Sequence, residues 1–143
     1  MKRHIEPRPP AVTAAQRRAL LEAAAKAVRH AHAPYSKYRV GAAVLTGEGL
    51  IFSGCNVENA SYGLTVCAER VAVFSAIAAG CSAITALAVV AGGAATPYPC
   101  GACRQVLAEF CRPETPIYVV QSGRSSTLKL GRLLPLSFRL LPS

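Results

Sequence analysis

The segment from Ala83 to Ala91 reads AITALAVVA, a run of small and branched apolar residues with one hydroxyl and no charge. Its apolar positions do not alternate with polar ones, which is typical of a β-strand that is covered on both faces. Gly80 precedes the segment and Gly92 follows it, so turn residues bound it on both sides. The segment therefore predicts a central strand with helices on both sides of its sheet.

The flanking segments complete this layered architecture. Helical spacing of apolar residues predicts helices over 13–32, 67–79 and 101–111, with Thr13 as an N-cap, Gly80 as a left-handed C-cap, and a last short turn of helix at 130–134. Strands are expected at 40–45, 50–57, 83–91, 116–121 and 126–129, the first two joined by a glycine turn at 47–49. This order predicts an α/β fold of three α/β/α layers around a mixed five-stranded sheet.

The charge is concentrated at the N-terminal end of the 143-residue chain. The whole chain has a formal charge of +9. Nine of its 16 Lys and Arg residues lie in residues 1–39, and the rest of the chain is close to neutral. A polynucleotide-binding protein aligns basic residues along the face that holds the strand, so we expect neither a nucleic-acid polymer nor a membrane as partner. We interpret residues 1–12 as a basic, proline-rich tail and residues 13–143 as one domain of a cytoplasmic protein.

The absent residue types exclude several kinds of catalytic site. All seven acidic residues are glutamates, which excludes a Ser-His-Asp triad, an aspartic dyad and an EF-hand loop. The three histidines are His4, His30 and His32, so a metal bound further along the chain has to rely on cysteine and glutamate. In a reducing compartment the six cysteines are thiols or metal ligands rather than disulfides.

Two short motifs carry the candidate chemistry, CAER at 67–70 and PCGACR at 99–104. The spacing of Cys100 and Cys103 allows both sulfurs to bind one ion from the first turn of a helix, although a redox dithiol has the same spacing. Cys67, at another predicted helix start, supplies a third sulfur. Three thiolates with an open fourth position are typical of a catalytic zinc, which uses that position for water.

Glu69 is placed to move protons rather than to bind the metal. It lies two residues after Cys67, as the glutamate does in zinc deaminases, where it accepts a proton from water and passes it to the substrate. Three thiolates on Zn²⁺ leave a negative site, so we expect Arg70 and Arg104 to donate hydrogen bonds to the sulfurs. Cys55, Cys81 and Cys111 are interpreted as small apolar residues.

Between about Ala14 and Phe138 the sequence resembles the cytidine deaminase family, in its short, homotetrameric, three-cysteine branch. The resemblance is carried by PYSKY at 34–38, VGAA at 40–43, NVENASY at 56–62, both zinc motifs with Gln105, and LLPLSF at 133–138. It implies one Zn²⁺ per chain and hydrolytic deamination of cytidine and 2′-deoxycytidine to uridine and 2′-deoxyuridine, with release of ammonia, a reaction of pyrimidine salvage.

The resemblance also implies roles for individual residues. Cys67, Cys100 and Cys103 would hold zinc, Glu69 would be the proton shuttle, and the backbone of Ala68 would bind the amide edge of the pyrimidine. Asn56 and Glu58 would hydrogen-bond the ribose, and Tyr38 would line the site where the family commonly has phenylalanine. Ala60 and Tyr62 would reach the ribose in a neighbouring subunit, and Phe138 would cover the pyrimidine of another.

The chain departs from the family pattern at Tyr38, at Gly63, where proline often stands, and at Tyr98, where serine is usual. Two other functions stay open at this point. One is a related zinc deaminase that acts on another nucleoside such as blasticidin S, or on a base within a polynucleotide. The other is a non-catalytic zinc or thiol-redox module that uses Cys100 and Cys103, in which Glu69 would have no task.

Overall fold

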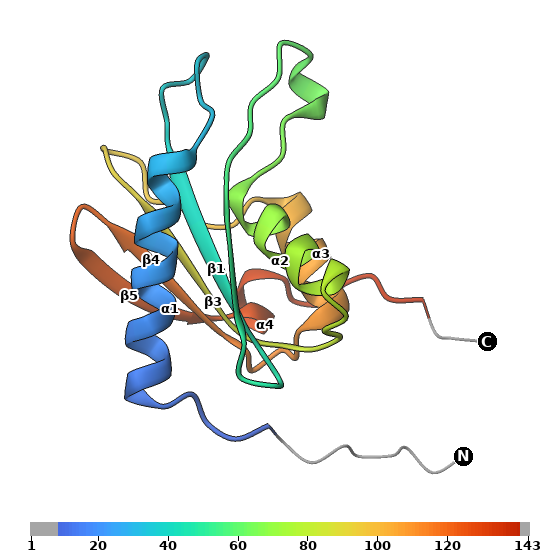
Figure 1. Ribbon diagram of the computed structural model, residues 1–143. Coiled ribbons are helices and arrows are strands. Elements are labelled where there is room, and N and C mark those ends of the chain that lie inside the picture. The colour runs from blue at the N-terminus through green and yellow to red at the C-terminus, as the bar shows by residue number, and fades with distance from the viewer. Residues whose placement is uncertain (1–8, 141–143) are drawn as a thin grey trace.

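The structure is a computed structural model that describes residues 9–140. Its main helices are α1 (Ala14–Ala27), α2 (Ala68–Ala78), α3 (Gly101–Phe110) and α4 (Leu130–Leu133), and its strands are β1 (Val40–Thr46), β2 (Ile51–Cys55), β3 (Ile84–Ala91), β4 (Pro116–Gln121) and β5 (Arg124–Lys129). The strands form one sheet in the order β2-β1-β3-β4-β5 (Figure 1). Only β3 and β4 pair in parallel, so the sheet is mixed, as expected.

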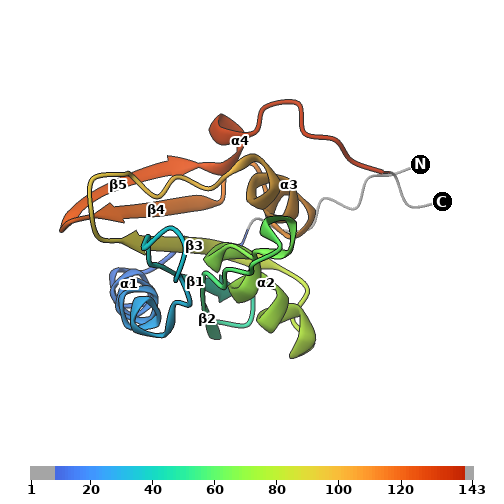
Figure 2. The same cartoon turned by 90° about the horizontal axis from the view of Figure 1, so that it is seen from above.

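Helices cover both faces of this sheet. Figure 2 shows α1 on one side and α2 and α3 on the other. Leu20 and Ala24 of α1 pack with alternate residues of β1 and β3, whereas Val73 of α2 and Leu107 of α3 belong to a larger cluster on the opposite face. Every residue of β1 is buried because both of its faces are covered. The expected α/β/α layering is confirmed.

Two glycines allow the helices to lie close to the sheet. A Cβ atom on Gly41 would lie 2.1 Å from the Ala24 carbonyl oxygen of α1, and a Cβ atom on Gly54 would lie 2.5 Å from the Ala72 nitrogen of α2. Real Cβ atoms do not approach backbone this closely, so neither position accepts a larger residue unless a helix moves. Gly54 therefore sets how near the beginning of α2 lies to the sheet.

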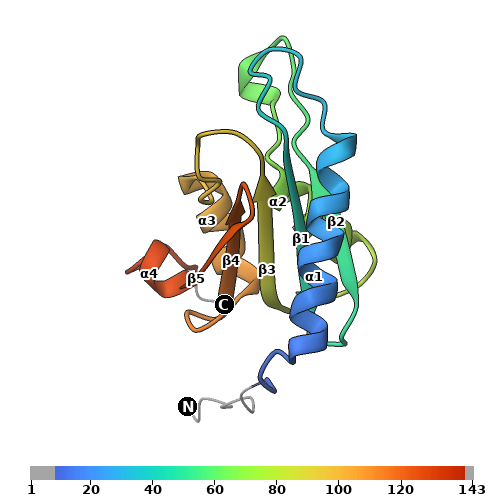
Figure 3. The same ribbon diagram turned by 90° about the vertical axis from the view of Figure 1, so that its left-hand side faces the viewer.

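The strand directions bring the two predicted motifs to one edge of the sheet. Strands β2 and β3 both pair antiparallel with β1, so they run parallel to each other and end at the same edge. Helix α2 follows β2, and α3 follows β3 (Figure 3). Their first turns therefore lie near the beginning of β1, and the carboxyl ends of strands in open α/β sheets are where ligands bind.

Most predicted elements form at or near their expected bounds, with differences at a few ends. Strand β2 ends at Cys55 because the chain then pairs with His32 and Val66 through Val57. Strand β5 begins at Arg124, two residues earlier than expected, and α1 ends in a 3-10 turn at Val28–His30. Thr13 caps α1 in a capping box with Gln16, and Gly80 has the expected positive φ.

The N-terminal tail predicted at 1–12 lies mostly outside the described residues, which begin at residue 9. In the described part of the chain, no helix has the length and apolarity that crossing a membrane requires.

Candidate metal centre and pocket

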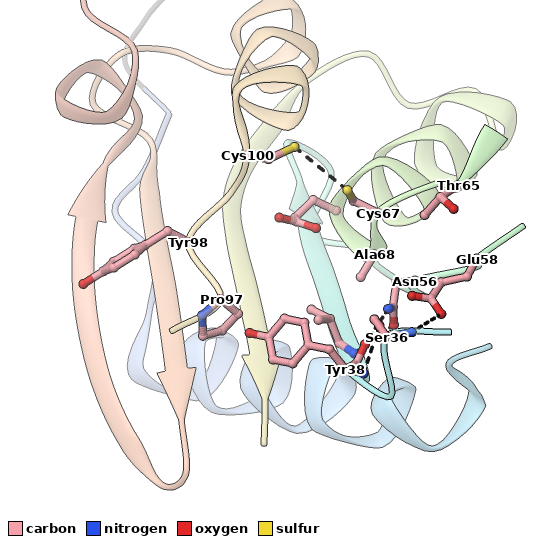
Figure 4. Close-up of a pocket in the computed structure, with 12 residues that line it drawn as sticks. Ser36, Tyr38, Asn56, Glu58, Thr65, Cys67, Ala68, Pro97, Tyr98 and Cys100 are labelled. Atoms are coloured by element: carbon pink, nitrogen blue, oxygen red, sulfur yellow. Dashed lines mark hydrogen bonds between the residues drawn. The ribbon is translucent and has the colours of Figure 1, made fainter. Parts of the chain in front are cut away.

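The three predicted metal ligands come together in the structure. The sulfur atoms of Cys67, Cys100 and Cys103 all lie within 4.8 Å of one another, and those of Cys67 and Cys100 are 3.9 Å apart (Figure 4). A tetrahedral zinc with bonds of about 2.3 Å to sulfur separates its sulfur ligands by about 3.8 Å. The donor set and its spacing therefore fit zinc.

Two of these cysteines occupy the N-cap positions of helices. Cys67 caps α2 and Cys100 caps α3, and neither helix start has a side-chain capping hydrogen bond. The unpaired backbone N–H groups and the helix dipole favour negative charge there. The Cys103 thiol and the Arg70 guanidinium, both close to the Cys67 sulfur, lower the pKa of Cys67, so the thiolate form is favoured. The centre is preorganised for a cation.

The two arginines that end the motifs have different partners. Arg70 donates from Nη2 to the Cys67 sulfur at 3.4 Å, as expected. Arg104 does not reach a sulfur: its Nε donates to the Pro99 carbonyl at 2.7 Å and its Nη1 to the Leu133 carbonyl at 2.9 Å. The expected contact of Arg104 with the metal ligands is therefore wrong. Arg104 instead connects the segment before Cys100 to the C-terminal part of the chain.

Glu69 and Ala68 line a pocket of about 250 Å³ beside the sulfurs. Glu69 is only 5% exposed although its side chain is acidic, and it forms no salt bridge among the described residues. Burial raises the pKa of Glu69 to about 7. A buried carboxyl group that faces a pocket next to a metal centre is in the place that a proton-transfer residue requires.

Asn56 and Glu58 line the same pocket and also support the segment at 35–40. The Asn56 side chain accepts a hydrogen bond from the Val40 nitrogen at 2.8 Å and donates one to the Tyr38 carbonyl at 2.7 Å. One oxygen of Glu58 accepts from the backbone nitrogens of Tyr35 and Ser36, at 2.9 and 3.1 Å. The Ser36 side chain and these backbone contacts lower the pKa of Glu58. The Asn56 amide keeps its second N–H, and the Glu58 carboxylate keeps its second oxygen, for a ligand.

Sequence reasoning missed some of the pocket wall. Besides Tyr38, which was expected, the lining includes five residues that the sequence did not single out as ligand contacts: Ser36, Val40, Thr65, Pro97 and Tyr98. Ser36 lies within the PYSKY motif and Pro97 lies close to Cys100, so proximity to the motifs was the available signal.

Burial, and after it the charge of Glu69, raises the pKa of Tyr38, so the phenol stays protonated and can donate a hydrogen bond.

The remaining predicted substrate contacts lie outside this pocket. Ala60 is exposed, Tyr62 is 76% exposed and Phe138 is 69% exposed. The Tyr62 ring contacts the Tyr35 ring edge to face, with centroids 6.0 Å apart, beside a second hollow that Glu58 and Thr65 share with the pocket. The structure thus leaves these residues on the surface of the chain, where they do not complete its own site.

The other three cysteines lie away from the sulfur cluster. Cys81 and Cys111 belong to the apolar cluster beneath α2 and α3, and Cys55 ends β2. Burial raises the pKa of Cys111 to about 12, so its thiol stays neutral.

Comparisons with known proteins agree with this arrangement. Residues 14–119 match the family described as "Cytidine and deoxycytidylate deaminase zinc-binding region". The chain is 46% identical over 120 residues to a cytidine deaminase of Sporosarcina psychrophila, covering 83% of this chain and 88% of that protein. A cytidine deaminase of Mycobacterium tuberculosis is 45% identical over 118 residues, 82% of this chain and 85% of its own length.

Solved structures are similar in fold as well. The crystal structure of a cytidine deaminase from Burkholderia pseudomallei superimposes with a TM-score of 0.80 at 48% identity and covers 85% of this chain and 98% of that one. The M. tuberculosis enzyme superimposes with a TM-score of 0.73 at 42% identity, over 86% of this chain and 97% of that chain.

Proposed function

This chain belongs to the cytidine deaminase family and catalyses the zinc-dependent hydrolytic deamination of cytidine, and we propose that the residues of the sulfur-lined pocket perform it. Water enters the reaction and ammonia leaves, so that cytidine becomes uridine. We extend the proposal to 2′-deoxycytidine and to a cytoplasmic location, where the thiols stay reduced. One observation carries the assignment of the site: three cysteine sulfurs form one cluster, and two of these cysteines, Cys67 and Cys100, line the same pocket as the buried Glu69.

Cys67, Cys100 and Cys103 would hold the zinc ion. When bound, zinc supplies Lewis acidity that brings the pKa of a water close to neutral. Three thiolates outweigh the double positive charge of zinc, and Arg70 offsets this excess through its hydrogen bond to the Cys67 sulfur. Arg70 therefore reduces the negative charge of the centre, so that the zinc ion keeps enough Lewis acidity for the attack of water on the substrate.

Glu69 moves the protons of the reaction. Its carboxylate accepts the two protons of the attacking water one after the other, and it passes the first to the pyrimidine ring nitrogen and the second to the amino group, which leaves as ammonia. The position of Glu69 in the first turn of α2 holds it next to Cys67, and its burial excludes bulk water from the transfer. A redox dithiol would give this buried carboxyl group no role.

The nucleoside lies across the pocket from Glu69 to Glu58. The backbone of Ala68 binds the amide edge of the pyrimidine, while the free N–H of Asn56 and the free oxygen of Glu58 bind the sugar hydroxyls. Tyr38 forms part of the wall of the same pocket. Free sugar hydroxyls are a property of a nucleoside rather than of a base within a polymer, which favours a small-molecule substrate.

We also propose that the active enzyme is a homotetramer in which subunits share sites. Ala60 and Tyr62 would contact the ribose in a neighbouring subunit, and Phe138 would cover the pyrimidine of another. Support comes from the exposure of Tyr62, which lines the hollow beside the pocket, and from that of Phe138, since large exposed apolar side chains can mark an interaction surface.

A combined activity and metal measurement tests the assignment. Purified protein is expected to contain zinc and to convert cytidine and 2′-deoxycytidine with loss of their ultraviolet absorbance and release of ammonia. Serine in place of Cys103 should remove both zinc and turnover, whereas serine in place of Cys55 should retain them. Zinc-loaded protein that leaves both nucleosides unchanged would refute the proposed activity.

Mixed subunits test the sharing of sites. Glu69→Ala and Phe138→Ala subunits should each have low activity alone. After unfolding and refolding together they should regain turnover, because some sites then combine an intact Glu69 with an intact Phe138 from a neighbour. A fully active monomer in light scattering, or no recovery in tetramers of proven mixed composition, contradicts the proposal.

A further inference from the structure

The loop at 92–98 connects β3 to the segment that carries Cys100, and it forms part of the pocket wall. Residues 92–96 are exposed, so burial does not hold them in place, and Gly93 has a φ of 86° that favours glycine. Pro97 is buried, and both Pro97 and Tyr98 line the pocket. The position of this wall therefore depends on the hydrogen bonds that the loop makes.

Three consecutive carbonyl groups of the loop accept side-chain hydrogen bonds, and they do so from two directions. Gln121 at the end of β4, which does not line the pocket, donates to Gly93 and Ala94, and it accepts from the Thr96 hydroxyl at 2.6 Å. Ser122 adds a bond to the Gly93 carbonyl at 3.2 Å. On the pocket side, the Tyr38 hydroxyl donates to the Ala95 carbonyl at 3.0 Å.

Tyr38 is itself fixed at the edge of the sheet. Its backbone nitrogen donates to the Ser36 hydroxyl at 3.0 Å, and its carbonyl accepts from the Asn56 side chain. Figure 4 shows its ring crossing the pocket toward Pro97, while Tyr98 points away. The phenol thus spans the distance between the groups proposed to hold the sugar and the loop that leads to Cys100.

We propose that Tyr38 is a positioning residue, whose hydroxyl holds the loop at 92–98 against the pocket and thereby strengthens nucleoside binding. The inference rests on the proposed function insofar as the ligand is a nucleoside. A phenylalanine, which lacks the hydroxyl, would line the same wall and leave the loop attached only from the Gln121 side. The loop would then open more often, and Pro97 would spend less time in its place beside the ligand.

Amide hydrogen exchange of the zinc-loaded enzyme without substrate tests the contact itself. Tyr38→Phe should speed exchange across residues 93–98 by about two- to tenfold, the range that one neutral hydrogen bond corresponds to. Tyr118→Phe is the matched control, because it removes a phenol hydroxyl on the α1 side of the sheet and should leave this exchange unchanged. Unchanged exchange in Tyr38→Phe would overturn the proposal.

Steady-state kinetics test the link to nucleoside binding. Tyr38→Phe should raise the KM for cytidine by about the same two- to tenfold and change kcat much less, because the zinc ligands and Glu69 are untouched. Gln121→Ala, which releases the loop from outside the pocket, should also raise KM. In the double variant the two effects should not multiply, because both act on one loop.

The possible results separate this inference from the proposed function. A raised KM in Tyr38→Phe, with normal loop exchange and a normal KM in Gln121→Ala, would mean that the hydroxyl contacts the nucleoside directly, which overturns the positioning role. A wild-type enzyme without cytidine turnover would refute the proposed function, whereas the exchange measurement would still report whether Tyr38 holds the loop.

Discussion

The first turns of α2 and α3 contain similar residues in different positions. Each helix has a cysteine at its N-cap and an arginine shortly after it. In α2, Arg70 is the third residue after the N-cap Cys67, and it contacts that cysteine's sulfur. In α3 the third residue after the N-cap is Cys103, and Arg104 follows it. A side chain at this third position lies back over the N-cap residue, as in a capping box.

This difference of one position separates two roles. In α3 the favoured position is taken by a second ligand, so Arg104 is turned about 100° around the helix axis, given 3.6 residues per turn, and contacts the Pro99 and Leu133 carbonyls instead. Arg70 acts on the charge of the sulfur cluster, whereas Arg104 holds backbone segments. Similar motifs therefore supply different functions because helix geometry places their side chains differently.

The largest effect is expected at Glu69, the second residue of α2, and its counterpart in α3, Ala102, serves as the control. Glu69→Gln should lower kcat by about 10²- to 10⁴-fold, because it removes the group that transfers protons while the ligands remain. Ala102→Gln, an exposed substitution, should change kcat by no more than about twofold. Stopped-assay kinetics with zinc analysis measure both, and near-normal turnover of Glu69→Gln with full zinc content would remove this residue from the reaction.

A smaller effect should distinguish the two arginines. Arg70→Gln is expected to lower zinc affinity by about 10- to 100-fold, the range for groups that support metal ligands from behind. Arg104→Gln should leave zinc affinity close to normal and instead speed hydrogen exchange in residues 133–138, because Leu133 loses its contact. Competition with a zinc chelator measures the affinities. Equal losses of zinc affinity in the two variants would contradict the different roles assigned to Arg70 and Arg104.

The smallest effect concerns Cys111 at the other end of α3. Burial raises its pKa to about 12 from about 8.5 in the unfolded chain. The resulting contribution to stability is complete below the unfolded pKa and is lost as the pH rises from about 9 toward 12, because only the unfolded chain then readily releases the proton. Cys111→Ala should therefore lose less of its free energy of unfolding than wild type between pH 8.5 and pH 11, measured by denaturant titration.

A parallel pH dependence of the two unfolding free energies would mean that Cys111 ionises freely in the folded protein. The same measurement on Cys55→Ala serves as the control, since Cys55 is only partly buried.

Local sequence patterns predicted the elements and the ligand set, and they failed where side chains reach across the chain. The run from Ala83 to Ala91 predicted the covered strand, and the spacing of Cys100 and Cys103 predicted that these two sulfurs meet, because both depend on short-range periodicity. The partner of Arg104 could not be predicted, because Leu133 lies 29 residues away. Likewise, nothing local indicates that the Tyr38 hydroxyl reaches Ala95, 57 residues further on.

The sequence by itself determined the chemistry of the centre: three thiolates at two helix starts, a glutamate beside one of them, and no aspartate or downstream histidine to offer an alternative. Only the tertiary structure decided how these pieces meet. Strands β2 and β3 end at the same edge because both pair with β1, and this long-range pairing brings Cys67 within 3.9 Å of Cys100. The spacing of residues along a helix is a local property, whereas the pairing of strands in a sheet depends on contacts between residues far apart in sequence.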